Sequence, residues 1–321
     1  MARALIVGSA GQDGRILSEQ LREGGHHVIG LDRGVLTSTD ASLALPASVE
    51  LGARGDVEAL IAAAMPDEIY YLAAFHHSSE DAFETDLADL FRQSVAVHVD
   101  GWVNVLEAAR TRSPRSRLFY AASSHVFGSP DEPVQNEATP FAPEGAYGIT
   151  KATGVGIARF FRARGLHVSC GILYNHESPL RPARFVSQRI AIGAVTAAAA
   201  ARAGRPFTLE LGSLSATVDW SWAADTTRAM SRIVRAEAPS DYVVASGIPH
   251  TVADFCDAAF RAVGLDYRSY VTERPGRVTK RLAPLVGDAS RLRSATGWAP
   301  TVSFEEMVRR LVEAARPEIE P

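Results

Sequence analysis

Short apolar runs alternate with amphipathic stretches over the first two-thirds of the chain. The runs are nearly continuous in apolar residues, which is the pattern of parallel strands buried on both faces. The stretches between them place apolar residues at helical spacing, so the order predicts βαβ units around a parallel sheet. The predicted strands are Arg3–Val7, His27–Leu31, Glu68–Leu72, Arg117–Ala121 and Val168–Leu173, and the predicted helices are Ile16–Glu23, Val57–Ala63, Leu87–Arg110 and Thr150–Arg164.

The alternation breaks near residue 174, where prolines and mixed charge begin. A last helix is predicted over Ser303–Ala315, after the turn Gly297-Trp298-Ala299-Pro300. The pattern predicts an α/β protein, a Rossmann doubly wound parallel sheet with a smaller C-terminal substrate-binding domain. We expect residues 1–173 and return segments near 212–246 in the first domain, and 174–211 and 247–321 in the second.

Composition narrows the setting. The 321 residues carry a formal charge of -4, which argues against nucleic acid or an acidic membrane as the main partner. Two cysteines, Cys170 and Cys256, are too few for a disulfide framework and fit a reducing compartment. The first residues read as a buried strand rather than a signal peptide, and the alanine-rich run Ala194–Ala201 is too short to span a bilayer. We therefore expect a soluble, cytoplasmic protein.

A glycine-rich turn, Gly8-x-x-Gly11-x-x-Gly14, lies between the first predicted strand and the first predicted helix. Glycines at this spacing allow a tight turn and a close approach to a pyrophosphate, whose charge is met by the helix N-terminus. Three glycines in such a loop can also form a plain tight turn. The position directly after the first strand favours a dinucleotide site.

The second predicted strand ends near Asp32, 18 residues after Gly14. A carboxylate there accepts hydrogen bonds from the adenosine ribose and repels a 2′-phosphate, which favours NAD over NADP. Arg33 leaves NADP open, because an arginine can stack on adenine or pair with a 2′-phosphate. Asp56, beside Val57, is a candidate for the adenine amino group, or else a turn aspartate that caps a helix.

Tyr147 and Lys151 stand four residues apart, on one face of a predicted helix. Tyrosine has an ordinary pKa near 10, and a nearby ammonium group is expected to lower that pKa towards neutrality. Lys151 could do this and also hold the nicotinamide ribose. An incidental pair on an amphipathic helix is the alternative, and the upstream glycine turn argues against it.

The chain resembles the extended short-chain dehydrogenase/reductase family, in its nucleotide-sugar epimerase/dehydratase group, and is most like GDP-mannose 4,6-dehydratases. The resemblance covers essentially the whole chain. It rests on the Gly11-Gln12-Asp13-Gly14 turn, Tyr71-Leu72-Ala73-Ala74, the run Gly171–Pro179 with its Asn-His-Glu-Ser-Pro, Phe185-Val186, Asp219-Trp220, Gly287-Asp288 and Gly297-Trp298.

The resemblance implies roles for individual residues. Ser123, 24 residues before Tyr147, takes the place of the catalytic serine or threonine, and polar Ser124 follows it at the carboxyl edge of the sheet. Gln12, Asp13 and Leu72, Ala73 and Ala74 fall on the cofactor side. On the substrate side, the resemblance implies that Asn175 contacts the sugar nucleotide, that Phe185 and Val186 lie near the nucleobase, and that Arg274 reaches the diphosphate.

Three positions depart from the family pattern. His125 stands where the dehydratases carry a glutamate that moves the C5 proton; histidine can transfer protons near neutral pH, or it can serve packing here. Val218 replaces an arginine directly before Asp219-Trp220. The pair His76-His77 suggests a metal, but no Cys/Asp/Glu set at ligand spacing supports one. One of these two histidines is expected to line the active-site mouth, or else to be a polar loop residue.

The sequence therefore predicts an enzyme that uses tightly bound NAD to oxidise a hexose hydroxyl, at C4, of a nucleotide sugar. Dehydration at C5 and C6 or epimerisation then follows. A reductase of 4-keto sugars that uses NAD(P)H is an alternative, and a non-catalytic dinucleotide sensor is another, against which the Tyr147–Lys151 pair argues. The resemblance also implies a homodimer through helices Leu87–Arg110 and Thr150–Arg164. The apolar positions Val99, Val103, Leu106, Ile157 and Phe160 are compatible with that interface, although a helix buried within one chain has the same pattern.

Overall fold

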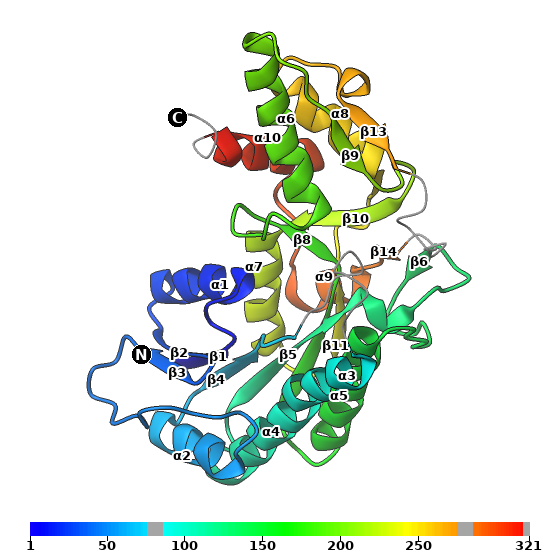
Figure 1. The fold of residues 1–321 in the computed structure, drawn as a ribbon. Coiled ribbons are helices and arrows are strands. Elements are labelled where there is room, and N and C mark those ends of the chain that lie inside the picture. Colours follow the sequence, from blue (N-terminus) through cyan, green and yellow to red (C-terminus); the bar gives the residue numbers. More distant parts are fainter. Residues whose placement is uncertain (76–85, 275–284, 317–321) are drawn as a thin grey trace.

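A twisted seven-stranded sheet forms the centre of the larger lobe (Figure 1). The structure, a computed structural model, describes residues 1–75, 86–274 and 285–316. Neighbouring strands are parallel except at one edge, where β3 is antiparallel to β2. In spatial order the strands are β11 (Asp241–Val244), β7 (Val168–Leu173), β5 (Arg117–Ser123), β4 (Glu68–Tyr71), β1 (Arg3–Val7), β2 (His27–Asp32) and β3 (Val35–Ser38).

Helices cover both faces of this sheet. One face carries α2 (Arg54–Ala64), α3 (Leu87–Val95), α4 (Gly101–Arg112) and α5 (Ala146–Arg162). The other carries α1 (Gln12–Glu23), α7 (Ala223–Val234) and α9 (Ser290–Thr296). This is the predicted α/β architecture with a doubly wound parallel sheet.

The strands feed two cores because successive side chains point to opposite faces. On β1, Leu5 and Val7 pack with the helices α2, α4 and α5, whereas Ala4 and Ile6 pack with α1 and α7. All four side chains are at most 1% exposed. Burial on both faces explains why these strands read as unbroken apolar runs in the sequence.

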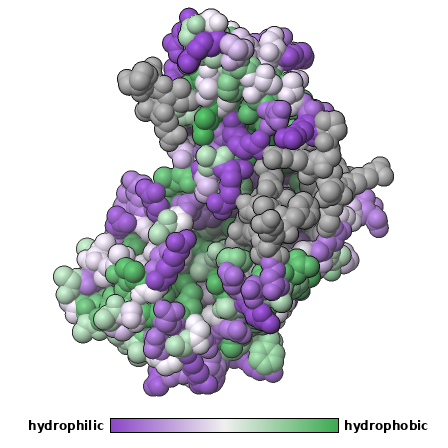
Figure 2. Space-filling model, viewed as in Figure 1, coloured by the Kyte–Doolittle hydropathy of each residue, from purple (hydrophilic) through white to green (hydrophobic). Residues whose placement is uncertain are grey.

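A smaller lobe sits above the carboxyl edge of the sheet and has its own apolar core. In the space-filling view, the surface is indented on the left side between the two lobes (Figure 2). The elements of this lobe and its junction are β8 (Asn175–Glu177), α6 (Val186–Arg202), β9 (Leu209–Leu211), β10 (Thr217–Trp222), β12 (Pro249–Thr251), α8 (Val252–Arg261), the 3-10 turn η3 (Tyr267–Ser269), β13 (Val271–Glu273) and α10 (Phe304–Ala315). The short strands β6 (Val134–Gln135) and β14 (Val286–Gly287) pair with each other at the junction.

The predicted helix Leu87–Arg110 is one continuous element in the sequence pattern but three in the structure. The π-helical turn η1 (Ala96–Asp100) separates α3 from α4. The helix predicted from Thr150 begins at Ala146 instead, which places Tyr147 inside α5. The two-domain division stays a prediction. One part of it concerns α9, which was assigned to the second domain: its Leu292 packs in the core between the sheet and the helices α1 and α7.

Candidate functional site

The glycine turn follows β1 and the segment Leu72–Ala74 follows β4, and these two strands end side by side. In the sheet, β2 lies on one side of β1 and β4 lies on the other. The chain therefore leaves β1 in one direction along the sheet and leaves β4 in the opposite direction, which makes this point a topological switch point. Ligands of open α/β sheets bind at such a switch point. Here the two loops touch, since a Cβ atom on Gly8 would lie 2.6 Å from the backbone nitrogen of Ala73.

Two of the three glycines are required by the fold itself. Gly8 has φ of +93°, a conformation that other residues rarely adopt, and a Cβ atom on Gly14 would lie 2.3 Å from the Gly8 carbonyl oxygen. Gly11 is different, because a Cβ atom at this position would lie 3.5 Å from its nearest neighbour, the Gly8 carbonyl oxygen. Gly11 also precedes α1 without offering a side-chain cap, which leaves the first-turn N–H groups for another acceptor. The turn therefore fits the pyrophosphate of a dinucleotide.

Alanine substitutions should separate these two roles. Gly14→Ala is expected to destabilise the protein by about 3 kcal/mol or more, since the methyl group meets backbone that cannot move aside. Gly11→Ala should leave the melting temperature nearly unchanged and weaken NAD(P) binding at least tenfold, because its methyl group would enter the space that the turn leaves for a pyrophosphate. Gly55→Ala, with nothing within 4 Å, is the matched control for both measurements. Equal NAD affinity in Gly11→Ala and the wild type would contradict the assignment.

The carboxylate of Asp32 closes the glycine turn from the end of β2. Its Oδ2 accepts a hydrogen bond from the Ala10 backbone N–H at 3.1 Å. The Arg33 side chain is 97% exposed, and its Nε lies 3.9 Å from Asp32 Oδ1. Asp56 accepts from the Glu50 backbone N–H at 3.1 Å in the first turn of α2. Val57 is only 1% exposed and packs in the core, so a ligand can meet its backbone but not its side chain.

The loop after β4 supplies the other wall of the cofactor side. Leu72, Ala73 and Ala74 follow the strand directly, and the Leu72 N–H donates to the Val7 carbonyl at 2.8 Å. The Leu72 side chain packs against the core on the α1 face. His76 lies outside the described residues, which resume at 86, so its predicted place at the active-site mouth stays a prediction.

Ser123, Tyr147 and Lys151 come together at the carboxyl end of β5. Ser123 lies close enough to Tyr147 to act against the rise of its pKa, and Ser123 Oγ accepts from the His125 N–H at 3.3 Å. Lys151 is 1% exposed; its Nζ donates to the Ala121 carbonyl at 2.7 Å and lies 5.8 Å from the centre of the Tyr147 ring. Tyr147 and Lys151 are one turn apart on α5, as the spacing predicted.

Electrostatics at this pair differ from the sequence expectation. Burial raises the pKa of Tyr147 to about 12, although the charge of Arg181 and the hydrogen bond with Ser123 oppose the rise. Burial also lowers the pKa of Lys151 to about 7. The lysine was expected to lower the tyrosine pKa, but a buried ammonium group itself loses its proton readily. A cation that enters the site with the ligands would favour the tyrosinate form.

His125 lies beside Tyr147 at the open side of the site. Its ring stands edge-on to the tyrosine ring, with the ring centres 5.8 Å apart, and the residue is exposed. Ser124, by contrast, is 3% exposed within the 3-10 turn η2 (Ser124–Phe127). His125 is therefore the better placed of the two to meet a substrate.

The predicted substrate residues are spread over the smaller lobe. Asn175 opens β8, and its carbonyl accepts from Ser221 Oγ at 3.3 Å. Phe185 precedes α6 with the Arg181 guanidinium 4.0 Å from its ring centre, and Val186 is the first residue of α6. Arg274 follows β13 and forms an exposed ion pair with Glu210 at 3.2 Å.

Val218, the apolar departure from the family pattern, packs against the core of the smaller lobe. It pairs across β10 and β12 with His250, whose ring stacks on Phe304 at 3.7 Å between centres. Three further cations shortly after Arg274 could also reach a diphosphate, but they lie among residues that the structure does not describe: Arg277, Lys280 and Arg281.

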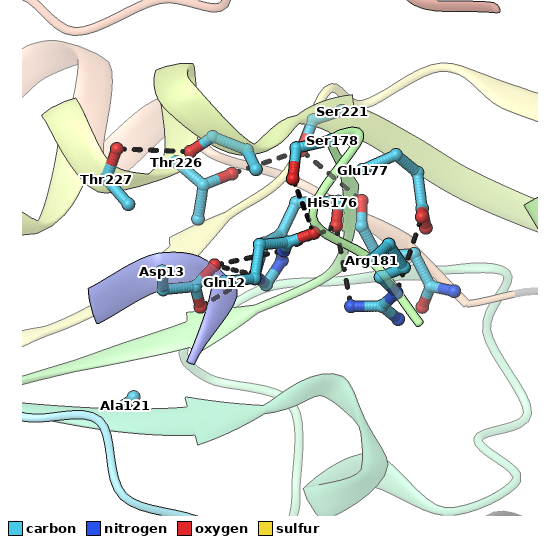
Figure 3. Close-up of polar contacts among 12 residues, drawn as sticks. Gln12, Asp13, Ala121, His176, Glu177, Ser178, Arg181, Ser221, Thr226 and Thr227 are labelled. Carbon is cyan, nitrogen blue, oxygen red and sulfur yellow. Dashed lines mark hydrogen bonds and ion pairs between the residues drawn. The ribbon is translucent and has the colours of Figure 1, made fainter. Parts of the chain in front are cut away.

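A buried bridge between the lobes is the main feature that sequence reasoning missed. At the start of α1, Asp13 faces His176 of β8, with His176 Nε2 3.0 Å from Asp13 Oδ2 (Figure 3). His176 Nδ1 lies 2.6 Å from the Tyr174 carbonyl. Both partners are acceptors, so both ring nitrogens carry protons and His176 is a cation. Gln12 adds two links, since it accepts from Ser178 Oγ at 2.9 Å and donates to the His176 carbonyl at 3.2 Å.

The pKa values of this pair agree with an ion pair. Burial acts to raise the pKa of Asp13, but the charge and hydrogen bond of His176 outweigh it and lower that pKa. Burial acts to lower the pKa of His176, and Asp13 likewise outweighs it and raises that pKa. Arg181 lies close by, with its Nε 3.4 Å from Glu177 Oε2. The Asn-His-Glu-Ser-Pro run marked this segment in the sequence, but nothing in it indicated Asp13 as the partner.

Ranges 1–75, 86–274 and 285–316 contain no cluster of three or more His, Cys, Asp or Glu side chains able to hold a metal ion. Within the same ranges, no helix has the length and apolar character needed to cross a membrane.

Comparisons with known proteins agree with this geometry. The sequence profile of the family described as GDP-mannose 4,6 dehydratase matches residues 5–311. GDP-mannose 4,6 dehydratase 1 of Arabidopsis thaliana is 34% identical over 334 residues, which cover 97% of this chain and 88% of the relative. The Drosophila melanogaster GDP-mannose 4,6 dehydratase is 32% identical, over 97% of this chain and 85% of its own.

Solved structures show the same fold. UDP-glucose 4-epimerase of Thermus thermophilus, in complex with NAD, superposes with a TM-score of 0.79 at 23% identity over 99% of this chain and all of the other. With the family profile spanning the sheet, the Ser123–Tyr147–Lys151 cluster and the smaller lobe alike, the chain belongs to the GDP-mannose 4,6-dehydratase family and is an NAD(P)-dependent enzyme of the nucleotide-sugar dehydratase/epimerase type.

Proposed function

We propose that this enzyme oxidises C4 of a GDP-linked hexose with NAD and then eliminates water across C5 and C6, as in a GDP-mannose 4,6-dehydratase. The carrying observation is that Tyr147 stands one turn from buried Lys151 on α5, with His125 edge-on to the tyrosine ring. The names of the curated relatives support the choice of GDP-mannose as substrate.

Tyr147 and Ser123 have different roles in the first proton transfer of this proposal. Tyr147 in its ionised form takes the proton of the C4 hydroxyl, while Ser123 donates a hydrogen bond to the same oxygen. Lys151 donates a hydrogen bond to the Ala121 carbonyl of β5, and in this proposal it also binds the nicotinamide ribose. The glycine turn, Asp32 and Lys151 would hold NAD, which when bound would supply the redox chemistry at C4 and C6.

His125 carries the second proton transfer in this proposal. The C4 ketone acidifies the C5–H bond, the neutral imidazole of His125 takes that proton, and the C6 hydroxyl leaves as water with a proton from the same ring. Hydride return to C6 and a proton from solvent at C5 complete a 4-keto-6-deoxy sugar. The exposed position of His125 beside Tyr147 supports this role.

Mass spectrometry in heavy water tests the proposal. Purified enzyme is incubated with GDP-, UDP-, CDP- and dTDP-hexoses without added cofactor. We expect GDP-mannose to lose one water and gain one deuterium. His125→Ala should lower this rate at least 100-fold, and His125→Glu, which restores the family residue, should retain it. No turnover of any sugar without added NAD(P)H would overturn the proposal in favour of a ketosugar reductase.

Epimerisation is the second candidate, and His125 is the observation that favours it. Rotation of the C4 ketone and hydride return on its other face need no residue at position 125. In the same experiment, an unchanged formula with a new isomer on chromatography would establish an epimerase. His125→Ala would then retain its activity.

We propose NAD rather than NADP as the cofactor. The Asp32 carboxylate, fixed by the Ala10 N–H, would repel a 2′-phosphate and accept from a free ribose hydroxyl. Asp32→Ala should reduce the preference for NAD, measured as the ratio of dissociation constants for NADP and NAD, by at least tenfold. Arg33→Ala, next to it and almost fully exposed, should change the ratio by less than threefold. A selective loss of NADP binding in Arg33→Ala would point to NADP.

We further propose a homodimer through α3, α4 and α5. Exposed apolar side chains lie on these helices: Leu87 72%, Phe91 39%, Val103 37%, Ile149 37% and Phe160 51%. Leu106, expected at this interface, is fully buried in the core and does not belong to it. Phe160→Arg should shift the protein from dimer to monomer in sedimentation velocity with an unchanged circular dichroism spectrum. A dimer that persists in Phe160→Arg would place the interface elsewhere.

The cytoplasm is the proposed location. Cys170 and Cys256 are both buried and free, which suits a reducing compartment.

A further inference from the structure

The π-helical turn between α3 and α4 places a histidine beneath the catalytic helix. A π turn inserts one extra residue and shifts the backbone hydrogen bonds, which releases carbonyl groups. Two strand tyrosines take up carbonyls of this turn: Tyr71 Oη donates to the Val97 carbonyl at 2.5 Å, and Tyr120 Oη donates to the His98 carbonyl at 3.3 Å. His98 itself is 0% exposed. The irregular turn is thus anchored in the core and presents a buried imidazole.

The hydrogen bonds of His98 fix its tautomer. The Phe75 backbone N–H donates to Nε2 at 3.0 Å, so Nε2 carries no proton. Nδ1 is therefore the protonated nitrogen, and it donates to Thr150 Oγ1 at 2.8 Å. Thr150 Oγ1 in turn donates to the Ala146 carbonyl at 2.8 Å. The ring is neutral and joins two parts of the site, since it accepts from the loop after β4 and donates to α5.

Both of these contacts lead to residues of the proposed reaction. Thr150 lies between Tyr147 and Lys151 on α5, and Phe75 follows the cofactor loop Leu72–Ala74. The His98 ring also stands edge-on to Tyr147, with 5.4 Å between ring centres and 82° between planes. We propose that His98 is a positioning residue: through Thr150 and its ring it sets Tyr147 against the substrate, and through Phe75 it sets the cofactor loop.

Two half-isosteres of histidine test the two arms separately. Asparagine places an amide at the position of Nδ1 and glutamine places one at the position of Nε2. His98→Asn keeps a donor for Thr150, so kcat should fall less than threefold while NAD binding weakens about tenfold. His98→Gln keeps an acceptor for Phe75, so NAD binding should change less than threefold while kcat falls about 30-fold or more.

Thr150→Val provides a second route to the same result, because it removes the acceptor of Nδ1 without touching the histidine. It should lower kcat as His98→Gln does and leave NAD affinity near the wild-type value. His167→Asn and His167→Gln, at the opposite edge of the sheet before β7, are the matched controls and should alter neither quantity.

A residue with a merely structural role would lower kcat, NAD affinity and melting temperature together in both His98 variants, and that pattern would overturn the inference. The inference rests on the proposed role of Tyr147 as base. If Tyr147→Phe is inactive but the two His98 variants do not separate kcat from NAD affinity, the positioning role alone fails. If Tyr147→Phe remains active, the proposed function fails first.

Discussion

Replacement of Tyr147 by phenylalanine should lower kcat by about 10³-fold or more, with the fold and NAD binding retained. Phenylalanine fills the same space, so packing against His98 and His125 persists. In the proposed mechanism the lost oxygen is the group that accepts the C4 hydroxyl proton, and removal of a positioned acid/base group costs about 10²–10⁴ in rate. The measurement is steady-state turnover beside thermal unfolding and NAD titration.

The same change at another tyrosine of the sheet is the control. Tyr242 lies on β11, where its hydroxyl reaches the Ala238 carbonyl at 3.5 Å, away from the carboxyl edge. Tyr242→Phe should therefore leave kcat within about twofold. Comparable rates for Tyr147→Phe and Tyr242→Phe would remove Tyr147 from the chemistry.

Replacement of Lys151 by methionine should abolish turnover and stabilise the fold at neutral pH. Burial lowers the pKa of Lys151 from 10.5 to about 7, so folding costs the free energy of giving up that proton. The shift corresponds to roughly 5 kcal/mol. Methionine also leaves the Ala121 carbonyl without its donor, at a cost of roughly 1–3 kcal/mol. A net gain of a few kcal/mol is expected in urea unfolding at pH 7.

The stability difference between Lys151→Met and the wild type should depend on pH. Between pH 7 and 10.5 the unfolded chain binds the lysine proton and the folded chain does not, so wild-type stability from this group rises with pH. Lys151→Met lacks that contribution, and the stability gap between the two proteins should narrow steadily from pH 7 to pH 10. Tyr147→Phe is the comparison, because the ordinary tyrosine pKa near 10 and the folded pKa of about 12 both lie at or above the top of that range, so the contribution of Tyr147 changes little. A constant gap would mean that Lys151 is charged when buried.

The sheet could be predicted from the sequence because its strands are buried on both faces and so leave unbroken apolar runs. Tyr147 and Lys151 could be paired for a similar reason, since their contact is local, four residues along one helix. The break in Leu87–Arg110 could not be seen, because one extra residue in a π turn changes the apolar spacing very little. The pKa of Tyr147 was expected to fall because of the nearby lysine. It rises instead because the side chain is buried, and burial cannot be inferred from the spacing of two residues.

Contacts that join distant segments were also beyond the sequence. Asp13 and His176 are separated by 163 positions, and each has an ordinary local explanation: an acidic residue in a helix first turn, and a histidine in a short strand. Only the packing of the smaller lobe against α1 brings them together. The same holds for His98 and Thr150, which are 52 positions apart.

The hydrogen bonds that join Gln12 and Asp13 to His176 and Ser178 limit how chimeric proteins can be made from this enzyme and its relatives. A chimera that takes the cofactor-binding segment from one parent and the sugar-binding segment from another cuts the chain between these pairs. If the parents differ at any of the four positions, a charge or amide remains buried without its partner, which costs several kcal/mol. Swaps of substrate specificity should therefore exchange residues 12, 13, 176 and 178 as one inherited unit.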